Sequence, residues 1–230
     1  MNREEIEKTQ KGILTDLNDH SNLLVSFGGI RQGLGIPVFE FYNSISDINC
    51  DKIYFRDFNQ SWYQKGVDSE LNHITKVTEY LKSIVRSHKY DNICFLGNSM
   101  GGYASILFGS TLNVDKVIAF SPQTSISRLY RLLNFDLRWG KQITQVHHFK
   151  HKVKAYFDLK KYLKHNSSYQ TQIHIYYSLN DKLDKKHAER LGPENNVTLH
   201  PIEEGGHAVA KVVRNRGELK SLIKSTFLQL

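Results

Sequence analysis

The chain has 230 residues, of which 40% are hydrophobic and 23% are charged, and its formal net charge is +8. This composition fits one globular domain and excludes a disordered chain, and no apolar run approaches the roughly 18 residues of a membrane-spanning helix. The first residues, MNREEIEKTQKG, do not resemble a secretory signal, so a cytoplasmic location with Cys50 and Cys94 in reduced form is expected.

Six short apolar segments have the length and composition of β-strands. They are residues 23–27, 52–55, 92–96, 116–120, 172–177 and 196–200. Between them, the spacing of apolar side chains predicts helices over residues 71–85 and 102–109, and an amphipathic helix over residues 212–227 closes the chain. The N-terminal 18 residues fit either a helix or a short strand.

Strands that alternate with helices predict an α/β fold with a mostly parallel central sheet and helices on both faces. We expect one domain over residues 1–230, with residues 124–170 inserted as a cap. In such a sheet the ligand site lies beyond the carboxyl ends of the strands. Functional residues are therefore expected directly after strands.

The strongest motif is GNSMGG at residues 97–102, which has the pattern G-x-S-x-G. It follows a predicted buried strand and precedes a predicted helix, which is the context of a nucleophile elbow. The turn would hold Ser99 above the sheet edge, and the helix N-terminus would add positive potential where an oxyanion forms. Ser99 is the predicted nucleophile.

A serine nucleophile needs a base, and the base needs an orienting acid. His207 is the predicted base because it lies in the Gly-rich loop EEGGH after the last predicted strand. Asp181 and Asp184 both follow the strand before it, and Asp181 is preferred because it lies nearer to the strand end. Asp184 is expected to face solvent or to begin a helix.

Backbone amides are expected to stabilise the oxyanion of the reaction. We predict that Gly28 and Met100 supply them, with Gly29 as the chief alternative to Gly28. Gly28 and Gly29 follow the first predicted strand, where a glycine pair would let a substrate approach the chain closely.

The motifs SFGG, GNSMGG and GGH, together with Asp181, resemble the α/β-hydrolase fold from about Leu23 to the C-terminus. The chain order of serine, aspartate and histidine matches that fold. A narrower similarity to surface-polysaccharide-associated proteins, including capsule O-acetyltransferases, rests on the second glycine after the serine, on SPQ at residues 121–123 and on GGH before a helix. The sequence SFG stands where common lipases and esterases have H-G-x.

The net charge is concentrated in residues 128–165, which we call the basic segment. This segment contains ten Lys or Arg residues and only two acidic residues, whereas the rest of the chain is neutral. It fits either a contact for an anionic substrate, such as an acidic polysaccharide or an acyl-CoA, or a helical lid with a solvated basic face. The predicted substrate-binding cations are Lys152, Lys154, Lys160 and Lys161.

Trp62 and Tyr63 follow the predicted strand at residues 52–55 and are further substrate-binding candidates. Their rings suit stacking on a sugar, and they also suit packing under the cap.

The predicted function is hydrolysis of an acyl ester by the serine, histidine and aspartate, with an acylated polysaccharide as one candidate substrate. One alternative is an O-acyltransferase that uses acetyl-CoA as the acyl donor for a surface polysaccharide. The other is a non-catalytic polyanion-binding protein of the same fold. Apart from that acyl donor, no cofactor, metal or nucleic-acid partner is expected.

Overall fold

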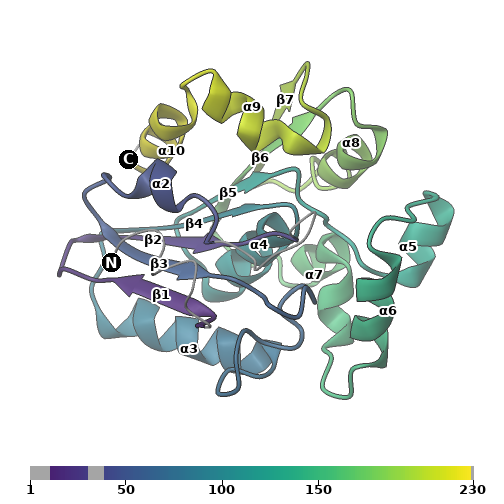
Figure 1. The fold of residues 1–230 in the computed structure, drawn as a ribbon, viewed down its shortest axis with the longest axis horizontal. Coiled ribbons are helices and arrows are strands. Elements are labelled where there is room, and N and C mark those ends of the chain that lie inside the picture. The colour runs from purple at the N-terminus through teal and green to yellow at the C-terminus, as the bar shows by residue number, and fades with distance from the viewer. Residues whose placement is uncertain (1–10, 31–38, 229–230) are drawn as a thin grey trace.

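The computed structural model describes residues 11–30 and 39–228. Its strands are β1 (Ile13–Asp16), β2 (Asn22–Phe27), β3 (Asp51–Phe55), β4 (Asn92–Asn98), β5 (Lys116–Phe120), β6 (Gln172–Ser178) and β7 (Val197–Ile202). They form a seven-stranded sheet in the order β1-β3-β2-β4-β5-β6-β7 (Figure 1). Strand β1 is antiparallel to β3, and the other neighbouring pairs are parallel.

The six predicted strands are confirmed close to their predicted bounds. Successive side chains of a strand point to opposite faces, so a central strand that is buried on both faces is apolar along most of its length. In β2, Leu23 and Val25 pack in the core on one face, whereas Leu24 packs in the core on the other. Part of the N-terminal region, where helix and strand had both been possible, forms the edge strand β1.

Helices cover both faces of the sheet (Figure 1). Helices α3 (Ile74–Ser87), α4 (Met100–Leu112), α7 (Leu159–His165) and α8 (Lys182–Glu189) contribute to one core. Helices α2 (Tyr42–Ile45), α9 (Val209–Asn215) and α10 (Leu219–Leu228) contribute to the other. The α/β architecture predicted from the alternation of strands and helices is confirmed.

The C-terminal helix that was predicted as one element is divided into α9 and α10. Gly217 lies between them with a φ of 76°, in the left-handed region that glycine adopts without a steric cost. The apolar spacing continues across the break, which explains why the sequence pattern indicated a single helix.

Helices α5 (Arg128–Leu133), α6 (Gly140–His148) and α7 lie in the chain between β5 and β6 and carry the basic segment. In Figure 1, α5 and α6 project to the side of the sheet. Cys50 and Cys94 are buried free thiols. Within residues 11–30 and 39–228, no helix combines the length and the apolar character that crossing a bilayer requires.

Candidate active site

Ser99 occupies a sharp turn between β4 and α4. Its φ of 55° is unusual for a residue with a side chain, and the strain is typical of a nucleophile elbow. Two glycines make the turn possible. A Cβ on Gly97 would lie 2.1 Å from the carbonyl oxygen of Gly101, and a Cβ on Gly101 would lie 2.0 Å from that of Phe27. The glycines of the motif are therefore required by close backbone packing.

His207 joins the serine to a buried carboxylate. Its Nε2 lies 2.8 Å from Oγ of Ser99, and its Nδ1 lies 2.7 Å from Oδ2 of Asp184. The three side chains lie in the segments that follow β4, β6 and β7, as expected for a site at the carboxyl edge of a parallel sheet. The hydrogen-bonded order is that of a catalytic triad.

The prediction that Asp181 is the carboxylate beside His207 is wrong. Asp181 is the N-cap of α8, where its Oδ1 accepts hydrogen bonds of 2.9 Å from the amides of Leu183 and Asp184. This bonding fixes Asp181 at the helix end and places Asp184 in the first turn, where it is fully buried. Aspartate is favoured both at an N-cap and in the first turn of a helix, so the start of α8 suits either residue and does not by itself identify the carboxylate beside His207.

Arg138 and Asp136 support Asp184 from the basic segment. Nη1 of Arg138 donates a 2.7 Å hydrogen bond to Oδ1 of Asp184, and Nε and Nη2 of Arg138 bond to Asp136. Asp136 also lies 3.1 Å from Nε2 of the buried His187. Burial alone would raise the pKa of Asp184, but its bonds to His207 and Arg138 outweigh burial and hold the pKa below its ordinary value.

The sequence interpretation missed these supporting residues. Arg138 had been counted only as one cation of the basic segment, and its partner Asp184 lies 46 positions away in the chain. A contact over such a distance leaves no local pattern in a single sequence.

Replacing Arg138 with Gln should lower the free energy of unfolding at neutral pH by about 3 kcal/mol, because it removes the arginine from the buried Asp184 and leaves the buried Asp136 only Arg131, at the longer distance of 3.7 Å, as an arginine partner. Arg138 helps to lower the pKa of both Asp136 and Asp184 in the folded protein. The stability it provides is therefore present above the unfolded-state pKa of these acids and is lost as the pH falls through their folded-state values. In urea denaturation, the difference in free energy of unfolding between the wild type and the variant should become smaller toward acid pH. A deficit that does not change with pH would contradict this origin.

The amide of Gly28, a predicted oxyanion donor, is already used in the sheet. It donates a 2.9 Å hydrogen bond to the carbonyl of Phe55, so the prediction for Gly28 is wrong. The amide of Gly29 donates a 2.8 Å bond to Oε2 of Glu40. Met100 is the first residue of α4, where the amides of a helix have no acceptor within the helix. The Met100 amide, next to Ser99 in the chain, therefore has no acceptor within α4.

Glu40 is a second carboxylate close to the nucleophile, and the sequence did not indicate it. Its Oε1 accepts a 3.2 Å hydrogen bond from the side chain of Asn98, the residue before Ser99. Burial raises the pKa of Glu40, although the bonds from Gly29 and Asn98 oppose this shift. The Gly29 amide is thus already bonded to a carboxylate oxygen of Glu40. A substrate oxygen would have to displace this oxygen before it could accept a hydrogen bond from the Gly29 amide.

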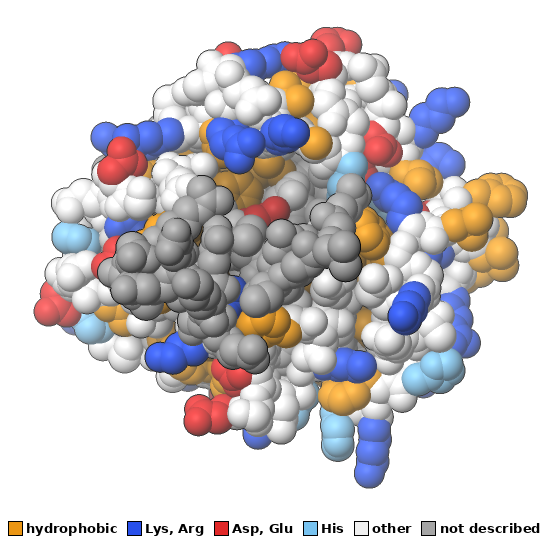
Figure 2. Space-filling view, viewed as in Figure 1, with side chains coloured by type: hydrophobic (Ala, Val, Ile, Leu, Met, Phe, Trp, Pro, Cys, Tyr) orange, Lys and Arg blue, Asp and Glu red, His pale blue; other side chains and the backbone are white. Residues whose placement is uncertain are grey.

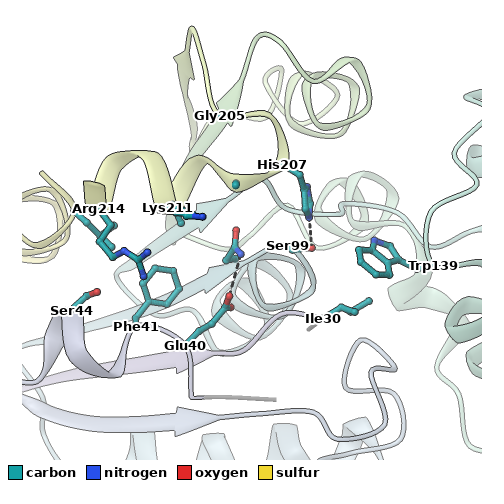
Figure 3. Close-up of a pocket in the computed structure, with 14 residues that line it drawn as sticks. Ile30, Glu40, Phe41, Ser44, Ser99, Trp139, Gly205, His207, Lys211 and Arg214 are labelled. Atoms are coloured by element: carbon teal, nitrogen blue, oxygen red, sulfur yellow. Dashed lines mark hydrogen bonds between the residues drawn. The ribbon is translucent and has the colours of Figure 1, made fainter. Parts of the chain in front are cut away.

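Ser99 and His207 line a cavity of about 400 Å³ (Figure 3). Trp139, from the segment between α5 and α6, forms part of its wall, and Ile30 lies near Ser99. On the other side, α9 contributes Lys211 and Arg214. The cavity therefore has an apolar wall on one side of the serine and two cations on the other.

Trp62 and Tyr63 do not reach this cavity, so their prediction as substrate-binding residues is wrong. Both are fully buried. The indole Nε1 of Trp62 donates to Gln123 over 3.1 Å, and the hydroxyl of Tyr63 donates to the carbonyl of Gly28 over 3.0 Å. These aromatic side chains pack beneath the elbow and hold it in place.

The four lysines predicted to bind substrate also lie outside the lining of the Ser99 cavity. Lys154 and Lys161 border a separate hollow with Phe157. Nζ of Lys152 donates a 2.9 Å bond to the carbonyl of Phe149. Lys160 lies on α7, which packs against α4. The concentration of charge in the basic segment did not indicate which cations face the site.

The strand order, the elbow after β4 and the placement of Ser99, Asp184 and His207 define an α/β-hydrolase fold. No protein-family model matches the chain, and no curated protein does. Solved structures do match it. The capsule O-acetyltransferase of Neisseria meningitidis serogroup A has a TM-score of 0.68 and 17% sequence identity, over 92% of this chain and 90% of that one.

Two hydrolases are also similar. Acetyl xylan esterase 1 from a Thermoanaerobacterium species matches with a TM-score of 0.59 and 16% identity, over 90% of this chain and 75% of that one. An α/β-hydrolase enzyme from a metagenome of Mar Chica lagoon sediments matches with a TM-score of 0.57 and 17% identity, over 93% of this chain and 94% of that one. These likenesses confirm the fold predicted from the motifs, including its resemblance to a capsule O-acetyltransferase.

Proposed function

We propose that this chain is an acyl-transfer enzyme of the serine hydrolase type, in which Ser99 attacks an ester, His207 moves the proton and Asp184 orients His207. The observation that carries the proposal is the continuous set of hydrogen bonds from Ser99 through His207 to Asp184, at one edge of an open cavity. A structural role alone would not explain a strained serine held against a histidine.

In the first half of the reaction, Ser99 Oγ attacks the ester carbonyl while Nε2 of His207 takes the hydroxyl proton. Asp184 accepts the hydrogen bond from Nδ1, which fixes the tautomer that leaves Nε2 free to act as a base. The carboxylate also stabilises the imidazolium that forms. Its lowered pKa keeps Asp184 ionised for this role.

The oxygen of the tetrahedral intermediate accepts a hydrogen bond from the Met100 amide at the start of α4. The Gly29 amide is the candidate second donor, once the substrate oxygen has replaced the carboxylate oxygen of Glu40. Collapse of the intermediate releases the alcohol or thiol, which takes the proton from His207, and leaves the acyl group on Ser99.

Water or a sugar hydroxyl then accepts the acyl group, and this step separates an esterase from an O-acyltransferase. The similar Neisseria protein is a capsule O-acetyltransferase, a mutant of which was determined in complex with CoA, and another similar protein is an acetyl xylan esterase. We therefore propose an acetylated or acetyl-accepting polysaccharide as the substrate class.

The test compares hydrolysis of p-nitrophenyl acetate and butyrate with consumption of acetyl-CoA in the presence of a panel of bacterial surface glycans. Faster acetyl-CoA consumption with one glycan than without any glycan identifies a transferase, and deacetylation of an acetylated glycan identifies an esterase. The Ser99→Ala variant is the control for both assays. Absence of every one of these activities in the wild-type protein would contradict the proposal.

Lys211 and Arg214 support an anionic substrate or acyl donor. They are three residues apart on α9, so they lie on the same side of the helix, and both line the Ser99 cavity. Among the described residues, neither forms an ion pair, whereas the nearby Arg216 pairs with Glu204. Two unpaired cations beside the nucleophile suit a phosphate or carboxylate remote from the reacting ester.

Replacing both Lys211 and Arg214 with Gln should raise KM for an anionic substrate such as acetyl-CoA about tenfold, since exposed ion pairs contribute up to about 1 kcal/mol each. KM for neutral p-nitrophenyl acetate should stay close to the wild-type value. Added salt should imitate the double substitution for the anionic substrate because it screens exposed charges. The double variant Lys160→Gln and Lys161→Gln is the matched control. Equal losses for both substrates would contradict this assignment.

A further inference from the structure

A group of large apolar side chains projects from the basic segment into solvent. We call residues 129–137 the apolar tip, and its five large apolar members are between 63% and 87% exposed. They are Leu129, Leu132, Leu133, Phe135 and Leu137. Figure 2 shows apolar side chains gathered at the edge of the molecule where α5 projects. A soluble surface rarely gathers so many exposed apolar side chains without a binding role.

Buried ion pairs hold the apolar tip in this position. Phe135 and Leu137 point outward, whereas Asp136 between them is 2% exposed and bonds to Arg138 and His187. The backbone amide of Asp136 also donates a 2.9 Å bond to the carbonyl of Arg131. The outward direction of the leucines and the phenylalanine is therefore fixed by the fold.

The surface around the apolar tip is cationic. The two acids of the basic segment, Asp136 and Asp158, are both buried and both paired with arginines. Arg128 and Lys141 flank the apolar tip and are exposed, and within the described residues neither forms an ion pair. The outer face of the basic segment thus presents cations and apolar groups but no exposed carboxylate.

A hollow of about 390 Å³ opens beside the apolar tip. Leu132, Phe135 and Ile143 contribute apolar lining, and the same hollow is lined by Arg128, by Arg131 and by Asp136, which is paired with Arg138. An apolar space next to a guanidinium matches an acyl chain attached to a phosphate headgroup, because guanidinium binds phosphate oxygens well. A second copy of this chain would instead bring two cationic faces together, which is unfavourable.

We propose that the apolar tip docks the protein on an anionic phospholipid surface, with its leucines and Phe135 among the lipid chains and Arg128 and Lys141 at the headgroups. Shallow burial of apolar side chains combined with attraction to anionic headgroups is a general mode of peripheral membrane binding. Trp139, two residues beyond Leu137, lines the Ser99 cavity, so the docked face adjoins the candidate active site.

The test is co-sedimentation of the full chain with phosphatidylcholine vesicles, with and without phosphatidylglycerol. We expect binding to the anionic vesicles that exceeds binding to neutral vesicles at least about tenfold. Phe135→Ser with Leu137→Ser, and separately Leu132→Ser with Leu133→Ser, should each reduce this binding at least about tenfold, since each pair removes two buried apolar side chains. Leu17→Ser is the matched control that should change nothing, because this exposed leucine follows the edge strand β1, whereas the apolar tip lies between β5 and β6.

Because these side chains are already exposed, the variants should keep the wild-type Tm and the wild-type rate with p-nitrophenyl acetate in solution. Absence of binding to anionic vesicles would overturn the proposal, and so would binding that survives both pairs of serine substitutions. A dimer that dissociates in the serine variants, seen by light scattering without vesicle binding, would overturn it in favour of self-association.

Discussion

Ser99→Ala should reduce kcat for p-nitrophenyl acetate on the order of 10⁶-fold, the scale of loss when a triad nucleophile is removed. The substitution deletes Oγ of Ser99, the atom that is hydrogen-bonded to His207. Alanine retains the Cβ, so the elbow and the packing around Gly97 and Gly101 should remain. Steady-state kinetics together with circular dichroism would separate lost chemistry from lost folding.

Ser44→Ala is the matched control for this experiment. Ser44 lines the same cavity but is not bonded to His207 in the described structure. Its variant should keep kcat within a fewfold of the wild-type value. A Ser99→Ala protein with unchanged activity would show that the reaction does not pass through an acyl-serine.

Asp184→Asn should reduce kcat about 10⁴-fold, because an amide in place of the carboxylate stabilises the wrong tautomer of His207 and does not stabilise its cation. Asp181→Ala should leave kcat near the wild-type value. It should instead lower the free energy of unfolding by about 1 kcal/mol, since Asp181 caps α8. The two substitutions thus separate a loss of catalytic rate from a loss of helix stability.

Kinetics and urea denaturation on both variants would check this contrast. Asn at position 184 also loses its charge pair with Arg138, so kcat should be measured under conditions where the variant is shown to be folded. If Asp181→Ala lost activity and Asp184→Asn retained it, the assignment of the orienting acid would be reversed.

The fold and two residues of the triad could be predicted because they leave local patterns. The strand at β4, the G-x-S-x-G turn and the start of α4 are adjacent in the chain, so the elbow at Ser99 is visible as a motif. His207 is visible in the same way, as a histidine in a glycine-rich loop after the last strand. The backbone sterics that require Gly97 and Gly101 act within this short stretch.

The aspartate of the triad and the cations that line the Ser99 cavity could not be predicted in this way. The choice between Asp181 and Asp184 depends on which carboxylate caps α8 and which turns back toward His207, and proximity to the strand end favoured the wrong one. Similarly, the count of cations identified the basic segment, but Lys211 and Arg214, the Lys and Arg residues that line the cavity among the described part of the chain, come from α9. Long-range packing determines both outcomes.

The most direct measurement of the central claim is covalent labelling with a fluorophosphonate probe, followed by peptide mapping. A nucleophilic Ser99 activated by His207 should form one adduct per chain, located on Ser99, and labelling should be lost in Ser99→Ala and strongly slowed in Asp184→Asn. Ser44→Ala should label like the wild type. A wild-type protein that remains unlabelled, or that is labelled at another serine, would contradict the assignment of Ser99 as the nucleophile.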